Sequence, residues 1–288
     1  MRIRRKKHLD ERLKNASDII NKLYEKNEIR SMIYSIIEHF TNYDLMKILS
    51  QKDELKVSES ELLKINFAIK DLKKEKPLQQ ILGYCEFLDV RINLNKQVLI
   101  PRVETEEIVQ RIIREHKGRK NLKIADICCG SGCIAIALKK AFPDADLYAY
   151  DISEEAIEQS KENANLNKEK INLIKENILE NKEKNQGFDI IVSNPPYVRE
   201  SEKALMRNNV LLYEPSLALF VSDENPLIFY EHILDFCNRN LAQNGQVYLE
   251  INEFLAKETE LLFKNFNYQT SVFKDIRGKD RLLFAKKD

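Results

Sequence analysis

The sequence predicts an α/β protein with a mostly parallel sheet, a small N-terminal helical domain and a linking β-hairpin. Strand-like and helix-like segments alternate regularly after residue 120, apolar residues recur at spacings of three and four between residues 17 and 75, and a period-two pattern lies between these regions. Such alternation is typical of a parallel sheet covered by helices. We therefore divide the chain into a basic tail (1–16), a helical domain (17–76), a β-hairpin linker (77–104) and an α/β domain (105–288).

The helical domain rests on three apolar stripes. The first runs from Ile29 to Phe40, and a short second stripe contains Leu45, Ile48 and Leu49. Ser58 with Glu61 three residues later forms a capping-box pattern. It precedes a third stripe made of Leu62, Ile65, Ile69 and Leu72.

The linker changes period at Pro77. Val90, Ile92 and Leu94 alternate with polar residues, and apolar residues resume at Val98 after Asn95-Lys96, which predicts a β-hairpin with its turn at residues 95 and 96. Thr105 is expected to cap a helix that runs through Ile113.

The α/β domain is expected to contain strands at 123–127, 146–150, 171–175, 188–193 and 246–251. Helices are expected at 133–141, 154–165 and near 226–239. After a further helix, strand-like segments at 268–274 and 281–286 predict an antiparallel hairpin at the end of the sheet.

Composition restricts the class of protein. With 288 residues, of which 43% are hydrophobic, the chain can bury a large core. The longest apolar run, from Cys133 to Leu138, is far too short to span a membrane, and the charged first twenty residues do not resemble a signal peptide. Five cysteines without paired spacing indicate neither a disulfide framework nor a zinc site, so we expect a cytoplasmic protein without a metal.

Charge is balanced overall but unevenly distributed. Residues 1–76 hold 18 Lys/Arg and 13 Asp/Glu, a net of +5, and the remainder carries −4. The excess lies in the first fourteen residues, which form either a solvated tail or a contact to RNA or an acidic partner. The α/β domain lacks a basic excess, so no stable nucleic-acid complex is expected.

A glycine loop is the first candidate site. Asp126-Ile127-Cys128-Cys129-Gly130-Ser131-Gly132 follows a predicted strand and opens a predicted helix, where backbone amides can approach a ligand closely. Asp151 ends the next strand, where a carboxylate can accept hydrogen bonds from ribose hydroxyls. We therefore expect Asp126, Cys128, Gly130, Gly132 and Asp151 to hold an adenosine-containing cofactor. The loop alone fits both nicotinamide and S-adenosylmethionine.

A second motif decides between these cofactors. Ser193-Asn194-Pro195-Pro196-Tyr197 follows an apolar strand, at the sheet edge where open α/β folds bind ligands. The Asn194 amide oxygen and the Pro195 carbonyl offer two acceptors for the two hydrogens of an NH2 group. Tyr197 adds an aromatic wall. This arrangement favours methyl transfer to nitrogen.

At this point the sequence resembles the release factor glutamine methyltransferases of the HemK/PrmC type. The resemblance is carried by the glycine loop, Asp151, Ser193–Tyr197 and the following segments: Pro77-Leu78-Gln79, Ile81-Leu82-Gly83, Glu86-Phe87, Leu99-Ile100-Pro101-Arg102, Glu104-Thr105-Glu106, Tyr213-Glu214-Pro215, and Asp275 with Gly278, Asp280 and Arg281. It implies a Rossmann-like class I methyltransferase sheet that binds S-adenosylmethionine. The implied substrate is the glutamine in the Gly-Gly-Gln loop of peptide chain release factors.

The resemblance also implies roles for individual residues. Asn194, Pro195 and Tyr197 would be catalytic. They would also bind substrate together with Pro196, Arg102 and Glu104, and Asn194 would contact the cofactor as well. Asn177 stands where the family usually has an acidic residue that holds the adenine amine. Two further departures are Val103, in place of a second proline, and Cys128, in place of a first glycine.

Other functions are weighed against this one. A methyltransferase of a large-subunit ribosomal protein shares the catalytic motif, and a nucleic-acid amine methyltransferase shares Asn-Pro-Pro-Tyr. The chain could instead be a cofactor-binding assembly or RNA-binding protein without turnover, although the intact Asn-Pro-Pro-Tyr argues against that. A nicotinamide dehydrogenase ranks last, because the tetrapeptide has no role in hydride transfer.

Overall fold

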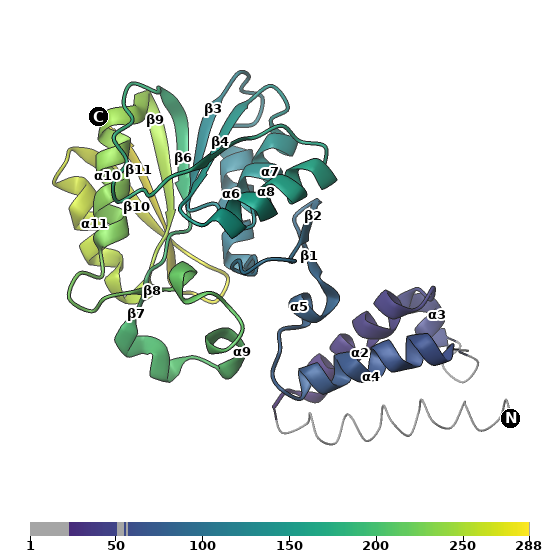
Figure 1. The fold of residues 1–288 in the computed structure, drawn as a ribbon. Helices are drawn as coiled ribbons and strands as arrows, with labels where there is room; N and C mark the ends of the chain where they lie inside the picture. The colour runs from purple at the N-terminus through teal and green to yellow at the C-terminus, as the bar shows by residue number, and fades with distance from the viewer. Residues whose placement is uncertain (1–22, 51–54, 56, 288) are drawn as a thin grey trace, which may run out of the picture. The chain divides into compact units, whose positions relative to one another are not determined.

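The computed structural model describes residues 23–50, 55 and 57–287, which form two compact units (Figure 1). Unit 1 contains the described residues up to Gly83 together with Asn208–Tyr213, and unit 2 contains Tyr84–Arg207 and the described residues from Glu214 onward. The basic tail (1–16) and the predicted start of the helical domain at residue 17 lie outside the described residues.

Unit 1 is helical, as its apolar stripes predict. Its helices are α2 (Lys26–Phe40), α3 (Leu45–Ser50), α4 (Glu59–Leu72) and α5 (Leu78–Leu82). Ser58 caps α4 in the predicted capping box, in which its side chain accepts from the Glu61 N–H and Glu61 accepts from the Ser58 N–H. The buried side chains of the stripes form one core: Ile29, Met32, Ile33, Ile36, Ile37, Ile48, Leu55, Ile65, Ala68, Ile69 and Leu72.

Two segments extend unit 1 beyond its predicted end at residue 76. Helix α5 belongs to it because Leu78, Ile81 and Leu82 pack against its core. The second segment, Asn208–Tyr213, includes the short helix α9 (Asn208–Leu211). It is held to unit 1 by polar contacts, including a 2.9 Å hydrogen bond from the Tyr213 hydroxyl to the Lys74 carbonyl.

Unit 2 begins with a β-hairpin that contains the predicted strand at Val90, but the predicted turn and second strand were wrong. The hairpin pairs β1 (Tyr84–Phe87) with β2 (Val90–Asn93) and turns at Leu88 and Asp89. The expected turn at Asn95 and Lys96 is instead bound to α8 (Glu154–Leu166), because both backbone N–H groups donate to the Gln159 Oε1 at 2.8 and 2.9 Å. A side-chain acceptor on a distant helix therefore replaces the expected strand pairing.

The main sheet confirms the predicted α/β class. Its strands are β3 (Lys123–Ile127), β4 (Asp146–Asp151), β5 (Asn172–Lys175), β6 (Phe188–Ser193), β9 (Leu241–Glu250), β10 (Tyr268–Lys274) and β11 (Asp280–Lys287). Their order is β10-β11-β9-β6-β3-β4-β5. The pairs from β9 to β5 are parallel, whereas β11 is antiparallel to both neighbours. The last two strands thus form the expected C-terminal hairpin.

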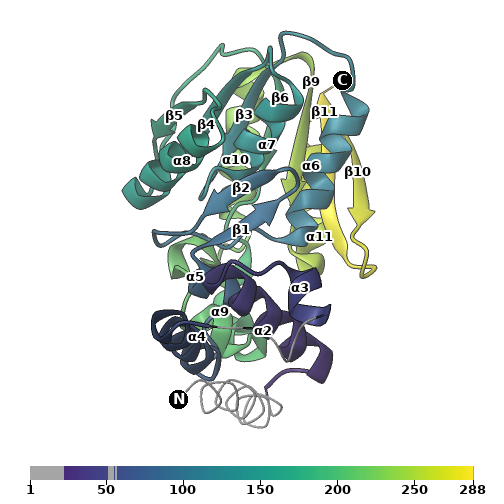
Figure 2. The same ribbon diagram turned by 90° about the vertical axis from the view of Figure 1, so that its right-hand side faces the viewer.

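Helices cover both faces of this sheet (Figures 1 and 2). Helices α6 (Val103–Glu115), α7 (Cys133–Ala141) and α8 lie on one face, and α10 (Ile228–Asn240) and α11 (Ala256–Lys264) lie on the other. Alternate residues of β6 enter the two cores: Ile190 and Val192 pack on the first face and Ile191 on the second. A central strand that is buried on both sides is expected to carry a continuous apolar run, as Ile190–Val192 of β6 do.

The order of the strands determines where a ligand can bind. The chain passes from β3 to β4 on one side and later returns to place β6 on the other side of β3. Open α/β sheets bind ligands outside the carboxyl ends of the strands at such a switch point. Within the described part of the chain, no helix is both long and apolar enough to cross a bilayer.

The segments around residues 198–221 and 253–255 contain short elements that the sequence did not predict. They are β7 (Val198–Arg199), paired in parallel with β8 (Phe220–Val221), and the 3-10 helices η1 (Glu200–Leu205), η2 (Ser216–Ala218) and η3 (Glu253–Leu255).

Candidate active site

A cavity in unit 2 opens at the carboxyl ends of β3, β4, β5 and β6, at the switch point of the sheet. Most of its wall comes from six short segments of the chain. These are Gln97–Val98–Leu99 with Pro101, Arg102 and Thr105; Ile127–Ser131; Tyr150–Ser153; Glu176–Ile178; Asn194 with Pro196; and Pro215 with Leu217 and Ala218. The predicted cofactor and substrate motifs therefore meet at one place.

The glycine loop after β3 has a left-handed backbone at three positions. The φ angles of Cys128, Gly130 and Gly132 are 62°, 54° and 78°. Gly132 is also needed for space, because a Cβ atom there would lie 2.8 Å from the Ser160 Oγ and 3.2 Å from its Cα. Cys128 adopts this left-handed conformation although it is not a glycine. It lines the cavity together with Gly130.

Two aspartates hold this loop, but in different positions. Asp151 lines the cavity, and its carboxylate accepts from the Gly130 N–H and the Ser153 N–H, both at 2.9 Å. Burial raises the pKa of Asp151, and these N–H groups partly offset that shift. Asp126 is completely buried behind the loop, away from the cavity wall, where its Oδ2 accepts from the Ala135 N–H at 3.1 Å. Asp126 therefore anchors the start of α7.

Asn177 lines the cavity in the loop after β5, as predicted. Its Oδ1 accepts from the Leu179 N–H and its Nδ2 donates to the Glu180 side chain, both at 3.1 Å. These bonds close a local turn that carries Glu176 and Ile178 into the same wall. An amide oxygen has two lone pairs, so Asn177 Oδ1 can accept a second hydrogen bond.

Asn194 stands at the end of β6, where it lines the cavity opposite the glycine loop. The Ser193 hydroxyl donates to the Ile127 carbonyl at 2.6 Å and ties β6 to β3 at this level. The Asn194 Nδ2 donates to the Thr105 Oγ1 at 3.1 Å, and Thr105 in turn donates to the Glu250 Oε2 at 2.6 Å. The NH2 group of the Asn194 side chain is thus held by Thr105, and Thr105 is held by the buried Glu250.

Of the other residues in the Asn-Pro-Pro-Tyr motif, one lines the cavity and two do not. Pro196 lines the cavity, whereas Pro195 is buried beside it. Tyr197 is not part of the wall, because its hydroxyl turns to the Glu250 Oε1 and donates to it at 2.9 Å. Burial raises the pKa of Tyr197 well above its ordinary value, and the negative charge of the neighbouring Glu250 raises it further. The structure therefore gives Tyr197 a supporting position instead of the expected aromatic wall.

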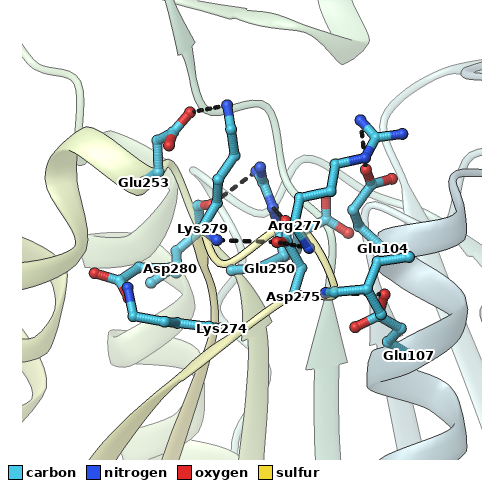
Figure 3. A network of polar contacts seen from close by, with 12 residues as sticks. Glu104, Glu107, Glu250, Glu253, Lys274, Asp275, Arg277, Lys279 and Asp280 are labelled. Atoms are coloured by element: carbon cyan, nitrogen blue, oxygen red, sulfur yellow. Dashed lines mark hydrogen bonds and ion pairs between the residues drawn. The ribbon is translucent and has the colours of Figure 1, made fainter.

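The predicted substrate residues Arg102 and Glu104 also separate. Arg102 lines the cavity and forms an ion pair with the buried Glu214, whose other oxygen accepts from the Ile100 N–H. Glu104 instead points to the turn between β10 and β11, where Arg277 Nη1 lies 3.3 Å from its Oε1 (Figure 3). Glu104 therefore anchors this turn to α6.

The sequence did not reveal that Thr105 and Glu250, which are far apart in the chain, bond to each other beside Asn194. Thr105 is not the cap of α6, which begins two residues earlier at Val103 with Arg102 as N-cap. Its side chain is free to bond Glu250 because it lies inside the first turn. Glu250 is buried at the end of β9, and burial raises its pKa. A single acid in the apolar run Val247–Ile251 is the signal that could have identified it.

The polar groups around the cavity fit an adenosine-containing cofactor. Asp151 offers carboxylate oxygens for the ribose, the left-handed loop brings the backbone of Gly130 to the cavity surface, and Asn177 offers an acceptor for the adenine amine. Among residues 23–50, 55 and 57–287, no three His, Cys, Asp or Glu side chains are grouped so that they could hold a metal ion.

Comparison with known proteins agrees with this geometry. The family model for the Methyltransferase small domain matches residues 105–219. A crystal structure of a methyltransferase from Pyrococcus furiosus has a TM-score of 0.52 at 17% identity, covering 80% of this chain and 99% of that one, which supports the fold.

Curated relatives extend the match to nearly the whole chain. The release factor glutamine methyltransferase of Flavobacterium psychrophilum is 45% identical over 265 residues, which cover 91% of this chain and 93% of the relative. The protein of the same name from Bacteroides thetaiotaomicron is 38% identical, over 92% of this chain and 95% of its own. Because identity at this level extends over both the cavity and the helical unit, the chain belongs to the release factor glutamine methyltransferase family.

Proposed function

We propose that the protein transfers a methyl group from S-adenosylmethionine to the side-chain amide nitrogen of the glutamine in the Gly-Gly-Gln loop of peptide chain release factors. The observation that carries this proposal is the placement of Asn194 at the end of β6, on the cavity wall, with its Nδ2 bound to Thr105. Its oxygen is then left to accept from a ligand. The names of the relatives support a release factor glutamine as the substrate.

The cofactor would be held by the residues on the glycine-loop side of the cavity. Asp151 would accept from the ribose hydroxyls, Asn177 from the adenine amine, and the backbone at Cys128 and Gly130 would allow close approach. When bound, S-adenosylmethionine supplies an activated methyl group on a positively charged sulfur.

The substrate amide needs orientation more than activation. An amide nitrogen is a poor nucleophile because its lone pair is delocalised into the carbonyl. The Asn194 oxygen and the Pro195 carbonyl would accept from its two N–H groups and direct the lone pair toward the methyl donor. The same acceptors would stabilise the positive charge that grows on nitrogen before one proton leaves to solvent. This step requires no His/Asp dyad or paired carboxylates.

The opposite part of the cavity wall would bind the substrate loop. Arg102 lies there with Pro215 and Leu217. The Arg102–Glu214 ion pair joins the segment after the β-hairpin to the segment that carries Pro215. This pair would fix the width of the entrance for a narrow side chain such as glutamine.

The test is methyl transfer from labelled S-adenosylmethionine to a purified release factor. A copy whose loop glutamine is replaced, a ribosomal protein and RNA serve as controls. Label on the glutamine form alone is the expected result. Label on the ribosomal protein alone would overturn the substrate, and measurable cofactor binding without any transfer would favour a binding protein.

A further inference from the structure

We propose that Thr105 and Glu250 are positioning residues that fix which end of the Asn194 amide faces the cavity. They would present its oxygen and keep its NH2 group behind, so that the site accepts a substrate group with N–H donors and rejects a carboxylate. This inference rests on the proposed function, because it concerns how the same site recognises glutamine.

Three side chains form a directional chain of hydrogen bonds. Asn194 Nδ2 lies 3.1 Å from Thr105 Oγ1, and Thr105 Oγ1 lies 2.6 Å from Glu250 Oε2. Thr105 and Glu250 are 2% and 1% exposed, so water does not compete for these bonds. Thr105 and Asn194 both line the cavity, and Asn194 is the less buried of the two.

The carboxylate of Glu250 determines the direction of these hydrogen bonds. An ionised carboxylate can only accept, so the single hydroxyl proton of Thr105 goes to Glu250. The Thr105 oxygen is then left with lone pairs alone, and the Asn194 atom that faces it must be the NH2 group. The hydrogen-bond partners therefore assign the nitrogen and the oxygen of the Asn194 amide.

The carboxylate of Glu250 is itself held on its other side. Its Oε1 accepts from the Tyr197 hydroxyl at 2.9 Å, and the Arg281 Nη1 donates to that hydroxyl at 3.3 Å. Arg281 is in turn bound to Asp275, next to the Glu250 position shown in Figure 3. These contacts supply donors and positive charge to Glu250, and they partly offset the rise in its pKa that burial causes.

Selectivity for glutamine follows from this polarity. Glutamine and glutamate side chains have nearly the same shape, so apolar walls cannot distinguish them. An amide oxygen facing the cavity attracts N–H groups and repels carboxylate oxygens, whereas a reversed Asn194 would bind a carboxylate. Sites built to hydrogen-bond one group reject an analogue that lacks it far more strongly than apolar pockets do.

The experiment compares Thr105→Val, Thr105→Ser and the unchanged protein. Valine keeps the shape of threonine but cannot accept from Asn194 or donate to Glu250, whereas serine keeps the hydroxyl. Two quantities are measured: kcat on a purified release factor, and inhibition by a copy of that factor in which the loop glutamine is replaced by glutamate. Thr270→Val is the matched control, because Thr270 also donates to a carboxylate, that of Glu260 at 3.0 Å, in a different part of unit 2.

We expect Thr105→Val to lower kcat by about 10-fold to 100-fold, with the dissociation constant of S-adenosylmethionine unchanged. The preference for the glutamine form over the glutamate form should narrow by at least about 10-fold. Thr105→Ser should restore both, and Thr270→Val should move neither. A merely structural role of Thr105 would lower stability without changing the preference. If Thr105→Val fails to fold, the smaller Thr105→Ala replaces it.

The outcomes separate the two proposals. An unchanged kcat and an unchanged preference in Thr105→Val would overturn the positioning role while leaving the proposed function intact. Absence of methyl transfer to the release factor by the unchanged protein would overturn the proposed function, and the positioning role would fall with it.

Discussion

Arg102 and Glu214 are 112 residues apart in the sequence, yet the Arg102 Nη2 lies 2.6 Å from the Glu214 Oε1. The Glu214 side chain is almost completely buried, while Arg102 remains about one-third exposed on the cavity wall. The second Glu214 oxygen accepts from the Ile100 N–H at 3.1 Å. One carboxylate therefore joins two distant segments that both contribute residues to the cavity wall.

Glu214→Ala should destabilise the protein by about 2 kcal/mol. Breaking a buried ion pair costs more than this, but the partial exposure of Arg102 reduces the loss. Chemical denaturation gives the free energy of unfolding. Asp235→Ala is the control, because its exposed pair with Arg239 lies within α10, and it should leave stability nearly unchanged. Equal effects of the two substitutions would argue against a structural role for Glu214.

Asn194→Ala should lower kcat by roughly 100-fold or more, the scale of losing one oriented polar group that acts on the reacting atoms. Cofactor affinity should change little, because Asp151 is held by the Gly130 and Ser153 N–H groups and not by Asn194. Steady-state methyl transfer and calorimetry measure the two quantities. Turnover near normal would contradict the assignment of Asn194 to the substrate amide.

Asp151→Ala should weaken S-adenosylmethionine binding by about 100-fold, because hydrogen bonds to a charged group are worth about 1.5–3 kcal/mol each. Calorimetry with the purified variant measures the dissociation constant. An unchanged value would refute the role of Asp151 at the ribose.

The same carboxylate makes cofactor binding sensitive to pH. Burial raises the pKa of Asp151 above that of an exposed aspartate, and the ionised form is the one that accepts two hydroxyl groups. Affinity should therefore be constant at high pH and fall as the pH drops toward this raised pKa, sooner than for an ordinary aspartate. Calorimetry across the acid range tests this expectation, and Asp151→Asn should bind weakly with a flat profile. A sloping profile in that variant would assign the titration to another group.

Gly132→Ala should destabilise the protein more than Gly118→Ala. Both glycines have φ angles in the left-handed region, 78° and 84°, so both substitutions impose a strain of about 1 kcal/mol. Only at position 132 does the new Cβ also meet Ser160, including its backbone. That contact should add about 1–3 kcal/mol and weaken cofactor binding. Equal losses of stability in thermal or chemical unfolding would show that the loop yields to the methyl group.

Local patterns predicted most of the fold because they act within a few residues. The alternation of strands and helices, the capping box at Ser58 and the apolar strand before Asn194 all depend on neighbours in sequence. The position of the β-hairpin could not be predicted in this way. The N–H groups of Asn95 and Lys96 donate to the side chain of Gln159, about sixty residues away, so these two residues do not form the expected turn.

Local patterns also predicted part of the candidate site, and contacts between distant residues again account for the rest. The loop glycines, Asp151 and Asn194 stand in local motifs at strand ends, so the sequence alone identifies them. The sequence predicts a helix cap at Thr105 because the true partner of its side chain, Glu250, is 145 residues away. It predicts an aromatic wall at Tyr197 because no local pattern reveals that the Tyr197 hydroxyl donates to the same acid.

The segment Asn208–Tyr213 has a practical consequence for dividing this protein. Because the segment is encoded within unit 2 but belongs to unit 1, the backbone passes from one unit to the other three times, after Gly83, Arg207 and Tyr213. A fragment that ends at Gly83 would lack the hydroxyl that bonds the Lys74 carbonyl, and a fragment that starts at Tyr84 would carry α9 without the residues it packs on. A fusion or swap of the helical unit between relatives must therefore exchange two stretches of sequence together.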